Sequence, residues 1–227
     1  MIARRLAAEA LGTGFLLAAI VGSGIMAERL CGGNIGLALL ANTLATSAAL
    51  VVLIAIFAPV SGAHFNPAVT LVFALRRDVP PMLAAGYVIA QLAGALGGVW
   101  AAHLMFAAPV FEISTKLRDG PAQVFSEFVA TFGLIGTIAG ALRFQPAWTP
   151  ALVGLYIGAA YWFTASTSFA NPAVTIARAL SNSFAGIAPH SAPGFIAAQL
   201  AGAVTGYVAF GWLFAPAVSD RKVREFC

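Results

Sequence analysis

Apolar residues fill most of this 227-residue chain in long segments, and short polar clusters separate these segments. Six segments are long enough to cross a lipid bilayer, whose hydrocarbon core of about 30 Å takes roughly 20 residues of helix. We predict these spans at about residues 6–27, 35–57, 82–106, 122–142, 150–167 and 193–215. The pattern therefore indicates an all-α membrane protein with six transmembrane helices and no separate soluble domain.

Two further apolar segments are too short to cross the membrane alone. Both begin with the sequence Asn-Pro-Ala-Val-Thr, one at Asn66 and the other at Asn171. Asparagine caps a helix because its side-chain oxygen accepts a backbone N–H, and proline suits the first helical turn. Each segment, 66–77 or 171–182, would be about 18 Å long, and two placed tip to tip would cover about 36 Å. We predict two half-helices that enter the membrane, with two ordinary helix caps as the alternative.

The order span, span, half-helix, span occurs twice along the chain. Glu9 of the first unit matches Glu127 of the second, and the Ala-Gln-Leu-Ala-Gly-Ala segment at 90–95 matches the one at 198–203. Each unit holds three spans, so the second unit enters the membrane from the opposite side. We therefore predict inverted repeats, at about residues 1–108 and 121–217, within one domain of residues 1–227. Discontinuous helices at matching places in such halves indicate a solute site near the membrane midplane.

Composition agrees with a membrane protein, because 60% of the residues are hydrophobic and only 9% are charged. The formal net charge of +4 requires no nucleic acid partner. With a cytoplasmic N-terminus, the inside would hold Arg4, Arg5, Arg76, Arg77, Arg143, Arg221, Lys222 and Arg224, and the outside would hold Arg29, Lys116, Arg118 and Arg178. This excess on one side predicts that both termini are cytoplasmic. With only two cysteines, Cys31 and Cys227, we expect no disulfide framework, and we expect no cleaved signal peptide.

Several of these features together resemble the major intrinsic protein family, the aquaporins and aquaglyceroporins, over nearly the whole chain. They are the two Asn-Pro-Ala motifs, the segment Ser61-Gly62-Ala63-His64, Glu9, Glu127 and the two Ala-Gln-Leu-Ala-Gly segments. The resemblance implies six spans and two re-entrant half-helices around one pore per subunit, and a homotetramer in the lipid bilayer. It also implies passive conduction of water or small uncharged solutes without a cofactor.

The stretch 167–178 is similar to that of bacterial aquaglyceroporins associated with arsenic resistance. This likeness implies a bacterial inner membrane protein that conducts glycerol-type polyols, arsenous acid, methylated arsenicals and water. Arsenous acid is uncharged at neutral pH and presents three hydroxyls, much as glycerol does. The chain has no phosphate-binding loop and no obvious proton relay, so we expect each solute to follow its own gradient.

The family resemblance also implies a central constriction where the half-helix N-termini meet. Here it would comprise Asn66, Pro67, Ala68, Asn171, Pro172 and Ala173. The positive ends of the helix dipoles and the asparagine amides would face a single file of solute and disfavour cations. The family match implies that Glu9 and Glu127 accept hydrogen bonds from the N–H groups of the two non-helical loops. We expect His64 to brace the first of these loops.

A second constriction near the outer mouth sets solute choice in this family. One of its four side chains is an arginine directly after the second Asn-Pro-Ala, and this chain has Val174 there. By spacing from the motifs, the other three positions fall on Thr46, Ala159 and Ser168. All four side chains are small and uncharged, which predicts a wide and weakly polar constriction, although small residues in spans also serve helix packing. Arg178, one turn beyond Val174, would put a charge in the outer vestibule or would lie on the outer surface.

Other functions remain as alternatives. A water-selective aquaporin is one, and a weakly ion-conducting member of the same fold is another, because loss of the arginine removes a fixed positive charge. An adhesion protein would need a blocked pore, which the small constriction residues argue against. Ser61 and His64 are the only nucleophile and base close in sequence, and they belong to the family's own motif, so we expect no enzymatic activity.

Overall fold

The computed structural model describes residues 1–215, and these residues form helices and loops without a strand. The helices are α1 (Ile2–Leu30), α2 (Ile35–Ser61), α3 (Pro67–Leu75), α4 (Pro81–Met105), α5 (Pro121–Phe144), α6 (Thr149–Phe163), α7 (Pro172–Arg178) and α8 (Ala192–Leu213), with short 3₁₀ turns at Pro146–Trp148 and Pro189–Ser191. Some predictions lie outside the described residues: the tail cations Arg221, Lys222 and Arg224, Cys227, the cytoplasmic C-terminus and the repeat end at 217.

Within the described part of the chain, five helices are long and apolar enough to cross a membrane, namely α1, α2, α4, α5 and α8 with the turn before it. The fifth predicted span is shorter than the predicted 150–167. Helix α6 has 15 residues, and the backbone becomes extended at Thr164. Thr164 turns its hydroxyl back to the Ala160 carbonyl, and Thr167 and Ser168 adopt positive φ. Because hydroxyl side chains compete for backbone groups, this stretch forms a loop toward the second Asn-Pro-Ala.

The two predicted half-helices are present and end earlier than expected. Helix α3 stops at Leu75, and α7 has seven residues and stops at Arg178 rather than at Asn182. After Arg178 the chain turns, and the Arg178 carbonyl accepts hydrogen bonds from Ser181 and Ile187. Serine and asparagine at 181–183 favour such turns over helix.

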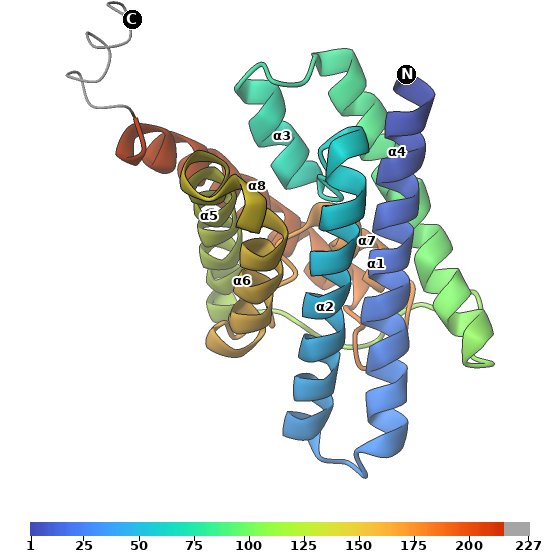
Figure 1. The fold of residues 1–227 in the computed structure, drawn as a ribbon. Helices are drawn as coiled ribbons and strands as arrows, with labels where there is room; N and C mark the ends of the chain where they lie inside the picture. Colours follow the sequence, from blue (N-terminus) through green and yellow to red (C-terminus); the bar gives the residue numbers. More distant parts are fainter. Residues whose placement is uncertain (216–227) are drawn as a thin grey trace, which may run out of the picture.

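Close helix pairs build each half of the molecule. Helix α1 packs along α4, and α5 packs along α8, while α3 and α7 lie between these pairs (Figure 1). Glycines allow this approach: a Cβ at Gly98 would collide with the Gly14 carbonyl, and one at Gly202 would collide with the Phe128 carbonyl. Small residues serve this purpose in membrane helices, where backbones must come close to gain packing energy. The pairs hold the two half-helices in the centre of the molecule.

Candidate functional site

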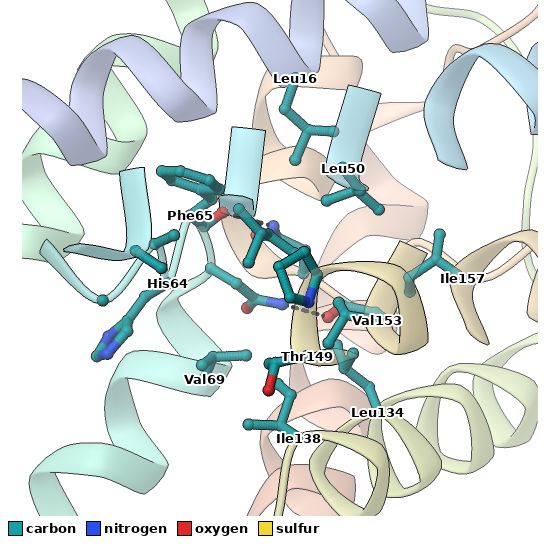
Figure 2. A pocket seen from close by; sticks show the side chains of 18 of the residues that line it. Leu16, Leu50, His64, Phe65, Val69, Leu134, Ile138, Thr149, Val153 and Ile157 are labelled. Carbon is teal, nitrogen blue, oxygen red and sulfur yellow. Dashed lines mark hydrogen bonds between the residues drawn. The ribbon is translucent and has the colours of Figure 1, made fainter. Parts of the chain in front are cut away.

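The two half-helices meet at their N-termini and are joined by their asparagines. Asn66 and Asn171 each cap their own helix, because the side-chain oxygen accepts the N–H of the residue two positions on, at 2.9 and 3.0 Å. The other side-chain atom bonds across the junction. Asn66 Nδ2 donates to the Ala170 carbonyl at 2.7 Å, and Asn171 Nδ2 donates to the Phe65 carbonyl at 2.8 Å. Figure 2 draws the bond at Phe65 as a dashed line.

A buried carboxylate supports the loop before the first half-helix. Glu9 of α1 is fully buried, and its oxygens accept hydrogen bonds from the backbone N–H of His64 at 3.0 Å and of Phe65 at 2.8 Å. Ser61 Oγ and Gln91 Nε2 also donate to Glu9, at 2.6 and 2.8 Å. Phe65 has φ +49°, where its N–H has no partner in a regular element, so the carboxylate satisfies it.

The loop before the second half-helix has the same support. Glu127 of α5 is fully buried and accepts from the N–H of Phe169 and of Ala170, both at 2.8 Å. Gln199 Nε2 of α8 donates to the same carboxylate at 2.6 Å. Ala170 has φ +48°, close to the value of its counterpart Phe65. Residues other than glycine are strained in this backbone conformation and keep it where several contacts hold them.

His64 lies at the wall of the cavity described below and is buried. Its Nδ1 lies 3.1 Å from Thr70 Oγ1, so the ring is tied to the first turns of α3. The ring also packs on Phe73, at 4.5 Å between centroids, and on Tyr87, at 5.3 Å. These contacts fix the ring in place from three sides.

A cavity of about 460 Å³ passes beside the asparagine pair. Most of its wall is apolar, and Figure 2 shows side chains of α1, α2, α3, α5 and α6 around it. These include Leu16, Leu50, Val69, Leu134, Ile138, Val153 and Ile157. The polar groups at the wall belong to the two loops, to Asn66 and Asn171, and to Thr46 and Tyr161. A solute in the cavity would meet a few polar groups on an otherwise apolar surface.

The structure places three of the four predicted outer constriction residues at the cavity: Thr46, Ser168 and Val174. The prediction for Ala159 is wrong, because its side chain is exposed and does not line the cavity. Two residues after Ile157, Ala159 lies on nearly the opposite side of α6. The side chain that lies at the wall instead is Tyr161, whose hydroxyl donates to Thr46 Oγ1 at 3.4 Å. The four-residue spacing of Val153, Ile157 and Tyr161 is the signal that could have found it.

Arg178 lies at the cavity and not on the outer surface, because only 2% of its area is exposed. Its Nε donates to the Ala185 carbonyl, and its Cζ lies 3.4 Å from the centroid of the Phe169 ring. Arg118, which sequence reasoning did not single out, lies over the same ring at 5.2 Å. Arg118 comes from the loop between α4 and α5, and burial lowers its pKa. Its Nε donates to the Gly186 carbonyl at 2.8 Å.

This chain is similar to a described protein family and to several individual proteins. The family model described as Major intrinsic protein matches residues 1–165. Aquaglyceroporin AqpS of Rhizobium meliloti (strain 1021) is 58% identical over 95% of this chain and 92% of the relative. The putative aquaporin NIP4-1 of Arabidopsis thaliana is 30% identical over 99% of this chain and 78% of the relative. The X-ray structure of the aquaglyceroporin from Plasmodium falciparum shares the fold, with a TM-score of 0.67, 21% identity, and coverage of 91% of this chain and 94% of the other.

Proposed function

This chain belongs to the major intrinsic protein family, and from that premise we propose that it is a passive membrane channel for small uncharged solutes. The solutes are glycerol-type polyols, arsenous acid, methylated arsenicals and water. The observation that carries this proposal is the cavity beside the asparagine pair, with Thr46, Ser168 and Val174 at its wall. At the position where other members of the family have an arginine, this chain has the smaller Val174, which leaves room for solutes larger than water.

The wall chemistry suits neutral polyols. Aliphatic side chains on α2, α5 and α6 offer a surface for the carbon skeleton of a polyol, and the loops and asparagines offer hydrogen-bonding groups for its hydroxyls. An amide nitrogen carries two hydrogens, so each asparagine keeps one donor after its bond across the junction. A bare ion would lose its hydration against the apolar wall at a high cost, whereas an uncharged solute loses much less. This contrast favours neutral solutes over ions.

The alternatives differ in what the constriction must do. A water-selective channel has bulky or charged side chains at the constriction positions, whereas Thr46, Ser168 and Val174 at these positions are small and uncharged. A cation channel needs a negative or neutral pathway. Here the positive dipole ends of two helices meet at Asn66 and Asn171, which disfavours cations. Both features support the solute channel.

Assembly and placement in the membrane are part of the same proposal. We propose a homotetramer in a bacterial inner membrane with both termini cytoplasmic and with inverted repeats at about 1–108 and 121–217. The distribution of arginine and lysine supports the orientation. The matching roles of Glu9 and Glu127 support the repeats, as do the reciprocal hydrogen bonds from each asparagine to the carbonyl before the other one.

Stopped-flow swelling of proteoliposomes tests the channel. We expect the wild-type protein to raise the permeability to glycerol, arsenite, urea and water above that of protein-free liposomes. Replacing Val174 by Arg together with Thr46 by Trp adds a planar charged group and an aromatic wall at the cavity, so glycerol and arsenite should slow more than water. An added barrier of about 1.4 kcal/mol reduces the flux about tenfold.

Ala159→Trp is the matched control, because it adds the same bulk to an exposed position of α6 outside the cavity. We expect this variant to keep the wild-type ratio of arsenite to water permeability. An unchanged ratio in the Val174→Arg, Thr46→Trp double variant, with intact assembly, would show that these positions do not control the pathway. Wild-type protein without any solute permeability would refute the channel itself.

A further inference from the structure

The outer part of the cavity contains a concentration of positive charge. Arg118 and Arg178 lie over one ring, that of Phe169, at 5.2 and 3.4 Å from its centroid. Residues 1–215 contain one salt bridge, between Arg76 and Asp78. Neither Arg118 nor Arg178 is therefore in an ion pair within this part of the chain. Glu127 is the carboxylate whose charge acts on both arginines, and its oxygens are already bonded to loop N–H groups and to Gln199. The two guanidinium charges are therefore only partly compensated.

Lys116 adds to this charge from the same loop. Its Nζ donates to the Phe184 carbonyl at 2.9 Å, and Arg118 Nη2 donates to the same oxygen at 3.3 Å. Burial and then the nearby Arg118 lower the pKa of Lys116. Three cations thus gather around the loop that follows α7.

The two arginines differ in how their donors are used. Arg118 has protein acceptors at all three nitrogens, with Nη1 at 3.4 Å from both Ser166 O and Thr167 Oγ1. Arg178 is bonded through Nε to Ala185, whereas its buried Nη1 has no hydrogen-bond partner among residues 1–215. Within the same described part of the chain, Ser168 Oγ is also buried without a hydrogen-bond partner. Ser168 and Arg178 both line the cavity. A buried polar atom without a partner is uncommon, and a bound solute or water would supply the missing partner.

We propose that Arg178 and Ser168 form a binding site for a small monocarboxylate in the outer part of the cavity. Arg118, whose nitrogens are already bonded to protein acceptors, adds positive charge near the site. A carboxylate supplies acceptor oxygens for a guanidinium N–H and for a hydroxyl, and charge-assisted bonds of this kind are strong. A solute of glycerol's size fits a cavity of about 460 Å³. The proposal goes beyond passage of neutral solutes, because it assigns an anion-binding step to the channel entrance.

The site has two consequences for conduction. A bound carboxylate would stop there, because the aliphatic wall beyond it penalises a charge that has lost its hydration. Small organic acids would therefore compete with neutral solutes for the entrance. The same guanidinium groups repel cations, so they restore, one helical turn away, the fixed positive charge that is missing at Val174.

Glycerol and glycerate form a suitable probe pair, because they share a three-carbon skeleton and differ by one carboxylate. We expect external glycerate to inhibit wild-type glycerol swelling at constant ionic strength and osmolarity, and neutral erythritol to inhibit it less. Arg178→Met should raise the inhibition constant of glycerate at least about tenfold. Arg178→Lys should give a smaller increase, because it keeps the charge and loses the planar fork of donors. Ser168→Ala should also weaken the inhibition.

Arg29→Met is the matched control. Arg29 lies over the Phe106 ring at 5.2 Å and donates to a carbonyl, much as Arg178 does, but it is exposed and lies outside the cavity. This variant should keep the wild-type inhibition by glycerate. Equal inhibition constants for wild type and Arg178→Met would overturn the assignment to Arg178.

Calorimetric titration of the purified wild-type protein with glycerate separates this proposal from the channel function. Binding in detergent needs no flux, so it tests the site even if no neutral solute passes. If Arg178→Met does not assemble, titrations of Arg178→Lys and Ser168→Ala with glycerate test the site instead. An unchanged affinity for glycerate in both variants would contradict the site. The proposal also fails if glycerate gives neither binding heat nor inhibition in the wild-type protein.

Discussion

Each asparagine of the central pair combines three tasks in one side chain. The oxygen caps a helix, one N–H closes the junction with the opposite loop, and the second N–H stays available to a solute. Aspartate could perform only the first task, because it has no N–H and carries a charge. The amide is therefore required both for the architecture and for the electrostatic barrier.

We expect Asn171→Asp to admit cations. The change places a carboxylate where two half-helix N-termini meet, so it offsets their positive field and removes the donor to the Phe65 carbonyl. Planar-bilayer current and a pH-sensitive dye inside proteoliposomes measure the leak. Asn34→Asp is the control, because Asn34 caps the exposed start of α2 and aspartate caps equally well. An Asn171→Asp channel that conducts glycerol and stays tight to protons and cations would contradict this barrier.

Single residues were predictable where a short motif fixes their surroundings. Asn66 and Asn171 follow from helix-capping chemistry, and a buried glutamate in an apolar span requires donors, which loop N–H groups supply at Glu9 and Glu127. Ala159 was misplaced because spacing from a motif on another element does not determine the rotation of α6 about its axis. Arg118 was not singled out because its place depends on how an irregular loop folds over α7.

At the scale of helices, hydropathy located the elements well and their ends less well. The length of α6 was overestimated because the hydroxyl-rich residues 164–168 follow an apolar segment without a charge to mark the end. The length of α7 was overestimated because Ala179 and Leu180 continue an apolar pattern after the helix has ended. In both cases the backbone leaves the helix to form a loop that side chains from other segments hold. Glu127 binds the loop before α7, and Glu112 and Glu28 bind the loop after it.

Two neighbouring glycines of α4 provide a test of helix packing. Gly98 faces α1, where an added Cβ would collide with the Gly14 backbone. An added Cβ at Gly97 would meet no described atom within 4 Å. We expect Gly98→Ala to destabilise the protein by about 1–3 kcal/mol, because two backbones must separate. Gly97→Ala should be neutral or stabilise the helix by up to about 1 kcal/mol.

The stability of Gly98→Ala and Gly97→Ala can be measured by thermal unfolding in detergent, followed by size-exclusion chromatography with fluorescence detection. The two substitutions add the same methyl group one residue apart, so a difference between them reports on the α1–α4 contact alone. If both variants melt at the wild-type temperature, the close approach of α1 and α4 contributes little to stability.

At the scale of the whole molecule, the architecture followed from three properties of the sequence: membrane-length apolar segments, two short segments with helix starts, and repetition of their order. An odd number of spans per repeat then requires opposite orientations of the halves. The packing of Arg118 and Arg178 on Phe169 could not follow from these properties, because it brings together three segments that are distant in sequence or irregular in backbone. Periodicity carries no information on such contacts.

Cysteine labelling in intact cells tests the proposed orientation. Cys31 lies in the turn between α1 and α2, is partly exposed and forms no disulfide within residues 1–215. It would face outward if the N-terminus is cytoplasmic. The other cysteine, Cys227, would be cytoplasmic. We expect a membrane-impermeant maleimide to label the wild-type protein from outside, because the reagent reaches Cys31 without crossing the bilayer.

The single variants Cys31→Ser and Cys227→Ser discriminate between the two orientations. With cytoplasmic termini, Cys31→Ser should lose the external label and regain it when the membrane is permeabilised, while Cys227→Ser should be labelled in intact cells. The inverted orientation would give the opposite pair of results. That outcome would place Arg118 and Arg178 on the cytoplasmic side, and the carboxylate site would then have to act on solutes that leave the cell.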